Sequence, residues 1–156
     1  MPDTQTKSQP FILFELAGTT YAIPTSAVQQ MEMIEHITPV PNTQKFVEGV
    51  VFSRGQVIPA INLRVRFGFP KIDYDVRSRL IVVHTNNRTV GLIADTAREF
   101  VSISSDIVQP PPEGISGLSG RYLTGIAMLG ERMVLILNIE ELLNFTNDIS
   151  AVSAEK

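Results

Sequence analysis

Short apolar segments of strand length recur along this chain, and Gly, Pro or Asn residues separate them. The clearest examples are residues 11–16, 79–84, 89–95 and 133–137. Gly and Asn accept the positive φ angles of tight turns, while Pro cannot donate a hydrogen bond to a neighbouring strand. The pattern predicts about eight to ten short strands and an all-β protein. Because open sheet edges favour aggregation, small closed barrels are the expected form.

Turn and cap residues locate several elements within this pattern. Hairpins are expected around residues 17–20, at Asn86-Asn87 and at Gly130-Glu131, where glycine at the first central position suits a type II′ turn. Residues 63–67 are expected to form one helical turn, and 139–145 a short C-terminal helix that begins after an asparagine cap. The sequence leaves residues 25–35 undecided between helix and strand. Their start suits a helical turn, but the apolar and polar residues that follow alternate as in a strand.

Length and composition limit the classes of protein that are possible. The 156 residues suit one compact domain or two small lobes that share a core. The chain has no cysteine, which excludes disulfides, thiolate metal sites and thiol catalysis and suits a reducing cytoplasm. Residues 1–10 are polar and are expected to form a disordered tail that precedes a domain over 11–146, and residues 147–156 are expected to fray. No apolar run is long enough for a membrane helix, so a soluble, cytoplasmic protein without direct membrane insertion is expected.

Patterns typical of catalysis or metal binding are weak. His36 and His84 fall on different expected strands, and neither has ligand spacing around it. The glycine-rich segment 114–120 fits neither a nucleophile elbow nor a phosphate-binding loop. Asp73 and Asp75 lack the further oxygen ligands of a calcium loop. We therefore expect no catalytic residue, no metal and no cofactor, and predict that the chain is not an enzyme.

The segment 46–64 reads as two apolar strands joined by a turn with one arginine near its tip. Gly55 supplies the positive φ of the reversal, and a type I turn with a glycine bulge is expected. Arg54 then lies beside Phe52 and Val57. A guanidinium among apolar side chains can orient a protein partner while its neighbours supply hydrophobic contact. An ordinary hairpin with a solvated arginine is the alternative.

Basic residues are concentrated in the middle of the chain. Seven of the thirteen Lys and Arg residues fall between positions 54 and 88. Folding could gather them into a basic patch or scatter them over several loops. A nucleic-acid-binding small β-barrel is therefore an alternative function. The net charge of −3, the absence of Trp and the few aromatics in this segment argue against nucleic acid. A hydrolase or isomerase in an unfamiliar β fold is the weakest candidate.

Six motifs in order along the chain resemble those of the bacterial chemotaxis coupling protein, the CheW family. They are FVEGV leading to RG (46–55), IPAINLR (58–64), VGLIAD (90–95), PPPE (110–113), YLTG (122–125) and LILNIEELL (135–143). The similarity runs from about Phe11 to Phe145. The resemblance implies two intertwined SH3-like five-stranded β-barrels with short helices, and a non-enzymatic adaptor. Such an adaptor bridges the cytoplasmic tips of methyl-accepting receptors to the regulatory domain of a CheA-type histidine kinase at membrane receptor arrays.

The resemblance also implies two sets of contact residues. The receptor-binding groove between the barrels would involve Val28, Phe52, Ser53, Arg54, Gly55 and Val57. The kinase contact would involve the first barrel around Ile37, Val40 and Phe46.

Several positions depart from the family pattern. Phe52-Ser53 replaces the common Asn-Leu before Arg-Gly, and Gln44 replaces a Pro. Gln30 replaces a frequent Glu, and Asn62 replaces a frequent Asp, so each removes a negative charge. We hypothesise that these changes select a different receptor set, for instance in twitching or phototaxis signalling instead of flagellar swimming.

Overall fold

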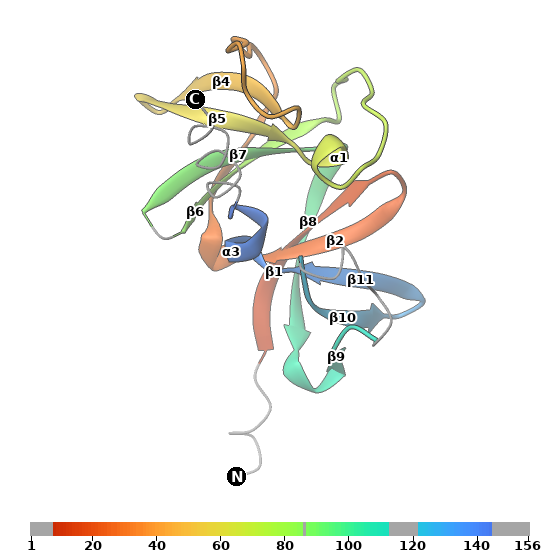
Figure 1. The fold of residues 1–156 in the computed structure, drawn as a ribbon. Coiled ribbons are helices and arrows are strands. Elements are labelled where there is room, and N and C mark those ends of the chain that lie inside the picture. The colour runs from red at the N-terminus through yellow and green to blue at the C-terminus, as the bar shows by residue number, and fades with distance from the viewer. Residues whose placement is uncertain (1–7, 86, 113–121, 145–156) are drawn as a thin grey trace.

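The computed structural model describes residues 8–85, 87–112 and 122–144, and these form two curved β-sheets with short helices (Figure 1). The strands are β1 (Ser8–Leu16), β2 (Thr19–Pro24), β3 (Val28–Met33), β4 (Val47–Ser53), β5 (Gln56–Asn62), β6 (Arg79–Thr85), β7 (Arg88–Ala94), β8 (Thr96–Ser104), β9 (Val108–Gln109), β10 (Leu123–Leu129) and β11 (Arg132–Leu137). The helices are α1 (Leu63–Arg66), α3 (Ile139–Leu142) and the single turns η2 (Thr25–Ala27) and η3 (Ser105–Ile107).

The two sheets exchange strands along the chain. One sheet has the order β3-β6-β7-β5-β4, and we call it barrel 1; the other has the order β8-β1-β2-β11-β10-β9, and we call it barrel 2. The N-terminal hairpin β1-β2 therefore belongs to barrel 2, where β2 runs parallel to β11. In barrel 1, β5 runs parallel to β7 in the same way. The prediction of an all-β fold with two intertwined SH3-like barrels is confirmed, with a sixth strand in barrel 2 within the described residues.

Each barrel contains the same hairpin-and-helix unit. In barrel 1 this is β4-β5-α1 and in barrel 2 it is β10-β11-α3. Both units have a register shift at a glycine, Gly49 or Gly125. Both helices begin at an asparagine whose side chain accepts a backbone N–H, from Val65 to Asn62 and from Glu141 to Asn138. The two glycines and the two capping asparagines thus occupy equivalent places in the two barrels, and the cap at Asn138 was expected.

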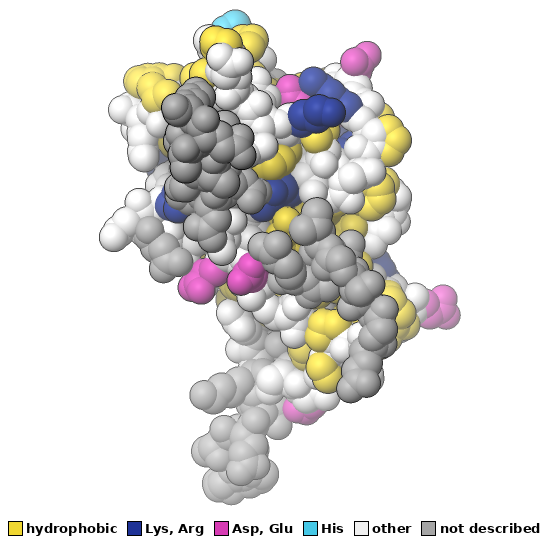
Figure 2. Space-filling view, in the orientation of Figure 1, with side chains coloured by type: hydrophobic (Ala, Val, Ile, Leu, Met, Phe, Trp, Pro, Cys, Tyr) yellow, Lys and Arg dark blue, Asp and Glu magenta, His cyan; other side chains and the backbone are white. Residues whose placement is uncertain are grey.

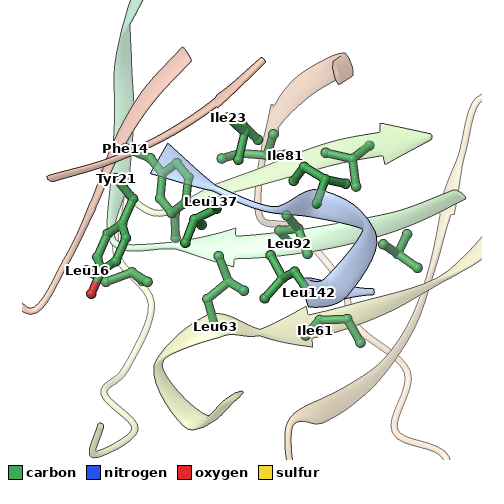
Figure 3. Packing of buried hydrophobic residues seen from close by; sticks show 14 of the residues in the cluster. Phe14, Leu16, Tyr21, Ile23, Ile61, Leu63, Ile81, Leu92, Leu137 and Leu142 are labelled. Atoms are coloured by element: carbon green, nitrogen blue, oxygen red, sulfur yellow. The ribbon is translucent and has the colours of Figure 1, made fainter. Parts of the chain in front are cut away.

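The hydrophobic core has three parts. The largest lies between the barrels and joins side chains from β1, β2, β5, β6, β7, β11 and α3, which point toward one another in Figure 3. Smaller clusters fill barrel 1, around Ile58 and Leu80, and barrel 2, around Phe11 and Val134. Strands such as β1 and β6 therefore bury both faces. This explains why residues 11–14 and 80–83 are continuously apolar instead of alternating.

Some element boundaries differ from those expected. The first strand begins at Ser8, inside the segment expected to be a tail, because Ser8 to Pro10 pair with β8. Residues 28–33 are a strand, which decides the open choice between helix and strand. The C-terminal helix ends at Leu142, sooner than predicted. The expected tails over 1–7 and 147–156 and the glycine-rich segment 114–120 lie outside the described residues.

Candidate protein-docking site

The hairpin β4-β5 ends in a two-residue turn made by Arg54 and Gly55. Ser53 pairs with Gln56, and both central residues have positive φ, 51° at Arg54 and 81° at Gly55. This is the φ pattern of a type I′ turn, whose twist matches that of the flanking strands. The prediction of a type I turn with a bulge was therefore wrong, because arginine itself takes the left-handed conformation. Residues other than Gly, Asn or Asp rarely adopt the left-handed conformation, so the backbone at Arg54 is strained.

The residues that flank this turn present hydrophobic surface to solvent. Phe52 and Val57 lie opposite each other on the two strands and are 72% and 63% exposed. Figure 2 shows hydrophobic side chains at the upper left, where Figure 1 has the turn between β4 and β5. Neighbouring exposed apolar side chains on a stiff hairpin indicate a surface that another protein covers.

The guanidinium of Arg54 is free to bind a partner. It is exposed, and across residues 8–85, 87–112 and 122–144 no hydrogen bond or ion pair engages it. The other basic residues of the segment 54–88 contact groups of the chain itself. These are Arg64 with Asp95, Arg66 over the rings of Phe46 and Tyr122, Lys71 with Glu48, Arg77 with Asp75, Arg79 with the carbonyls of Val76 and Ser78, and Arg88 with the carbonyl of Leu143. These basic residues are therefore engaged in separate local contacts, and they do not form one patch that could bind phosphates.

Ser53 faces the opposite way from its neighbours. It is 7% exposed, and its hydroxyl lies 2.7 Å from Gln30 Nε2 and 2.7 Å from Glu32 Oε2. A direct contact between the Ser53 side chain and a partner, as the family resemblance implied, does not fit this burial. Alternation along β4 is the reason, since Phe52 points outward and Ser53 therefore points inward.

A groove of about 310 Å³ runs beside the exposed pair. One wall is the segment from Glu32 to Thr38, and the other comprises Val50, Val51, Phe52 and Val57. A backbone bridge between Thr38 and Val50 holds the walls together. Exposed Met33 adds apolar surface, while Glu35 and His36 add polar groups. Sequence reasoning identified only Ile37 of this wall, although the alternation of apolar and polar residues in 25–35 was a signal for its first part.

The other predicted contact residues lie in different environments, some at the surface and some buried. Ile37 lines the groove together with Phe52 and Val57, so the two predicted contact sets meet here instead of lying on separate faces. Val40 is 39% exposed. Phe46 is buried under the Arg66 guanidinium, which lies 4.3 Å from its ring centre, so it is not available as a surface contact. Val28 is half-buried against the core between the barrels and does not line the groove.

Asn62 is buried at the end of β5 and contacts several polar groups. Its Nδ2 donates to Glu48 Oε2 at 2.9 Å and to the Tyr74 hydroxyl at 3.3 Å. Lys71 Nζ donates to the second oxygen of Glu48 at 3.0 Å. Burial alone would raise the pKa of Glu48, but the hydrogen bonds from Asn62 and Lys71 outweigh it and hold the pKa below its usual value. Burial, and then the charge of Glu48, raises the pKa of Tyr74.

The histidine and acidic side chains of the described residues do not form a metal site, and no described helix spans a membrane. Among the described residues, no three His, Cys, Asp or Glu side chains gather closely enough for a metal ion. His84 Nδ1 lies 2.7 Å from Thr89 Oγ1 on the neighbouring strand, and His36 lies on the groove wall. No helix within the ranges that the structure describes is long and apolar enough to span a bilayer.

Paired barrels that carry an exposed apolar hairpin around an unpaired arginine define a domain that docks to other proteins. Comparison with known proteins gives the same answer. The profile of the CheW-like domain matches residues 10–146, and the chain belongs to this family. The chemotaxis protein CheW of Klebsiella aerogenes is 35% identical over 140 residues, which cover 90% of this chain and 84% of that protein.

Other relatives agree with this assignment. Protein FrzA of Myxococcus xanthus is 27% identical, with 86% of this chain and 85% of that protein covered. The crystal structure of the scaffolding protein TtCheW from Thermoanaerobacter tengcongensis superposes with a TM-score of 0.81 at 30% identity, covering 88% of this chain and 94% of that one. The chain is a coupling adaptor of chemotaxis or related motility signalling. The nucleic-acid-binding alternative has no support among these matches.

Proposed function

We propose that this chain bridges the cytoplasmic tips of methyl-accepting receptors to the regulatory domain of a CheA-type histidine kinase, and that it does so without catalysing a reaction. It works in the cytoplasm, recruited to membrane receptor arrays. The observation that carries this proposal is the turn of barrel 1, where an unpaired and strained arginine stands between two exposed apolar side chains. Strained backbone positions cluster at functional sites.

The receptor contact centres on the tip of the hairpin. Phe52 and Val57 supply apolar anchors, and Arg54 fixes the register of the bound receptor helices by pairing with a carboxylate or carbonyl group. Gly55 contributes conformation, since its φ of 81° closes the turn. Val28 contributes from the groove between the barrels. Ser53 acts from behind the surface through its hydrogen bonds and not by direct contact.

The kinase contact uses Ile37 on the groove wall and Val40 just beyond its end, with Phe46 as buried support in barrel 1. This wall adjoins the receptor-binding tip through the bridge between Thr38 and Val50. An adaptor transmits a signal only when the binding of one partner changes its free energy of binding to the other. Neighbouring contact sets on one barrel supply a short physical route for such coupling.

The test mixes the purified chain with a CheA-type kinase and receptor signalling fragments, and follows co-sedimentation and kinase autophosphorylation. Arg54→Glu should weaken receptor association by about 2 kcal/mol, because it reverses a charge at an anchor, while the melting temperature stays within about 2 °C of wild type. Phe52→Asp should act similarly. Val76→Asp is the matched control, since Val76 is 74% exposed on the loop between α1 and β6 and does not line the groove. Failure of the wild-type chain to bind either partner would contradict the proposal.

The choice of pathway is tested with two receptors. Gln30, Ser53 and Asn62 all make hydrogen bonds within the docking hairpin or across the seam beside it, and FrzA is among the relatives. We expect the chain to discriminate between receptor tips of a flagellar and of a pilus-based system. Equal affinity for both would refute selection by these residues.

A further inference from the structure

Barrel 1 has a seam where the two edges of its sheet meet. The edge strands are β3 and β4. Within the described residues, one backbone bridge crosses the seam, between Thr38 and Val50, and it lies beyond the end of β3. Next to the Arg54 turn the seam is crossed by side chains, which we call the seam cluster: Gln30 and Glu32 from β3, and Ser53 from β4.

The seam cluster is a set of mutually bonded polar groups. The hydroxyl of Ser53 donates to Glu32 Oε2 at 2.7 Å and accepts from Gln30 Nε2 at 2.7 Å. Gln30 Nε2 also donates to Glu32 Oε2. Gln30 and Glu32 are two apart on a strand, so their side chains share a face. Hydrogen bonds to a carboxylate are the stronger kind, and they gain strength where solvent is excluded, as it is at Ser53.

The cluster acts on the residue that follows it. Ser53 directly precedes Arg54, whose φ of 51° is unfavourable for an arginine. A turn under strain relaxes unless its ends are held, and here one end is held by the antiparallel strand β5 and by the seam cluster. We propose that Gln30, Glu32 and Ser53 are positioning residues that fix the direction of the Arg54 side chain and thereby the set of receptors that the hairpin accepts. This inference rests on the proposed receptor contact.

The amide of Gln30 is essential to this arrangement. A glutamate at position 30 would replace the Nε2 donor with an acceptor and would place a second negative charge against Glu32. The seam would then lose the hydrogen bonds that Gln30 donates, and the turn would lose that part of its support. Gln30 and Ser53 therefore belong to one hydrogen-bonded network that crosses the seam.

The test is a double-mutant cycle read by binding of a receptor signalling fragment. Ser53→Ala should weaken binding about fivefold in the wild-type background and by less than about twofold in an Arg54→Ala background, because a positioning residue has no effect once the residue it positions is gone. Ser53→Thr keeps the hydroxyl and should restore binding. Ser102→Ala, at an exposed serine of barrel 2, is the control and should bind like wild type. Equal losses in both Arg54 backgrounds would overturn the proposal.

Hydrogen exchange supplies a readout that does not depend on any partner. Amide exchange at Gln56, which pairs with Ser53 across the turn, should accelerate in Ser53→Ala and in Gln30→Glu, while exchange in barrel 2 stays at its wild-type rate. An unchanged exchange rate at the turn would overturn the proposed role of the seam cluster in positioning Arg54, even if receptor binding fell. If the wild-type chain fails to bind receptor but these two variants loosen the turn, the receptor contact is wrong and the positioning of Arg54 stands.

Discussion

Arg64 and Asp95 form a two-point ion pair that joins the two barrels. Arg64 Nε lies 2.8 Å from Asp95 Oδ1 and Nη2 lies 2.7 Å from Oδ2. Asp95 Oδ2 also accepts the backbone N–H of Ala17 at 2.9 Å, in the turn between β1 and β2. Helix α1 of barrel 1 is thereby connected to the N-terminal hairpin of barrel 2. Both side chains are largely buried, with 15% and 23% of their surface exposed.

Asp95→Asn should lower the free energy of unfolding by about 2 kcal/mol, since it leaves the Arg64 guanidinium without its charged partner in a poorly solvated place. Chemical denaturation at pH 7 measures this change. Glu99→Gln is the control, because the Glu99–Arg132 pair is 50% and 42% exposed and should contribute less than about 0.5 kcal/mol. Equal effects of the two substitutions would show that the barrel-joining pair is an ordinary surface pair.

The same carboxylate predicts a pH dependence of stability. Burial would raise the pKa of Asp95, but the hydrogen bonds from Arg64 and from the Ala17 amide outweigh it, so the pKa is lowered in the folded protein. The stabilisation is therefore complete above the unfolded pKa of about 4 and is lost as the pH falls through the lower folded value. The gap in unfolding free energy between wild type and Asp95→Asn should be constant from pH 6 to 8 and shrink below pH 4. A gap that shrinks as the pH rises would contradict this assignment.

Arg54→Asn should stabilise the protein and weaken receptor binding at the same time. Asparagine accepts the left-handed conformation, and Asn-Gly is the preferred pair of a type I′ turn, so the unfolding free energy should rise by about 1 kcal/mol. Thermal unfolding and receptor affinity are measured on the same sample. Gly55→Ala is the opposite control, because a Cβ there meets open space and its cost of about 1 kcal/mol is conformational. A drop in stability for Arg54→Asn would show that the arginine is structural.

Asn62→Asp should destabilise the protein at neutral pH by about 2 kcal/mol. The new carboxylate would face Glu48, to which the Asn62 amide now donates at 2.9 Å, and like charges at this distance repel. Their repulsion raises the pKa of the introduced Asp, so the loss of stability should be largest above pH 6 and should diminish toward pH 4. Asn138→Asp is the matched control at the equivalent cap of α3, where aspartate serves equally well. A loss that is equal at both positions would point to the caps and not to Glu48.

Gly49→Ala should be among the most harmful single substitutions in barrel 1. A Cβ at this position would lie 2.1 Å from the carbonyl oxygen of Thr38, which is backbone and cannot move without breaking the bridge to Val50. We expect a loss of about 3 kcal/mol or more in unfolding free energy, measured by urea denaturation. Gly130→Ala, where nothing obstructs a Cβ, should cost only about 1 kcal/mol for its positive φ. Similar losses of unfolding free energy for the two substitutions would disprove the close approach of residue 49 to the Thr38 backbone.

Local sequence signals located most elements of this fold because each depends on neighbouring residues. Asn138 caps α3 as expected, Ser104 caps the turn that follows β8, and Gly130 has the φ of 65° that a type II′ turn requires. The turn type at Arg54 could not be predicted in this way. Arginine has no local preference for positive φ, and the strands on either side impose that conformation.

The sequence by itself determined the all-β class, the hairpins and the arginine-bearing turn, since turn chemistry and apolar runs are short-range properties. The tertiary structure alone decided which side chains meet: that β1 and β2 join the C-terminal strands, that Phe46 is buried while Phe52 is exposed, and that Gln30 reaches Ser53 across the seam. These relationships join residues far apart in the chain. They depend on how the sheets close and exchange strands, because a strand's pattern indicates that a face is buried but not what buries it.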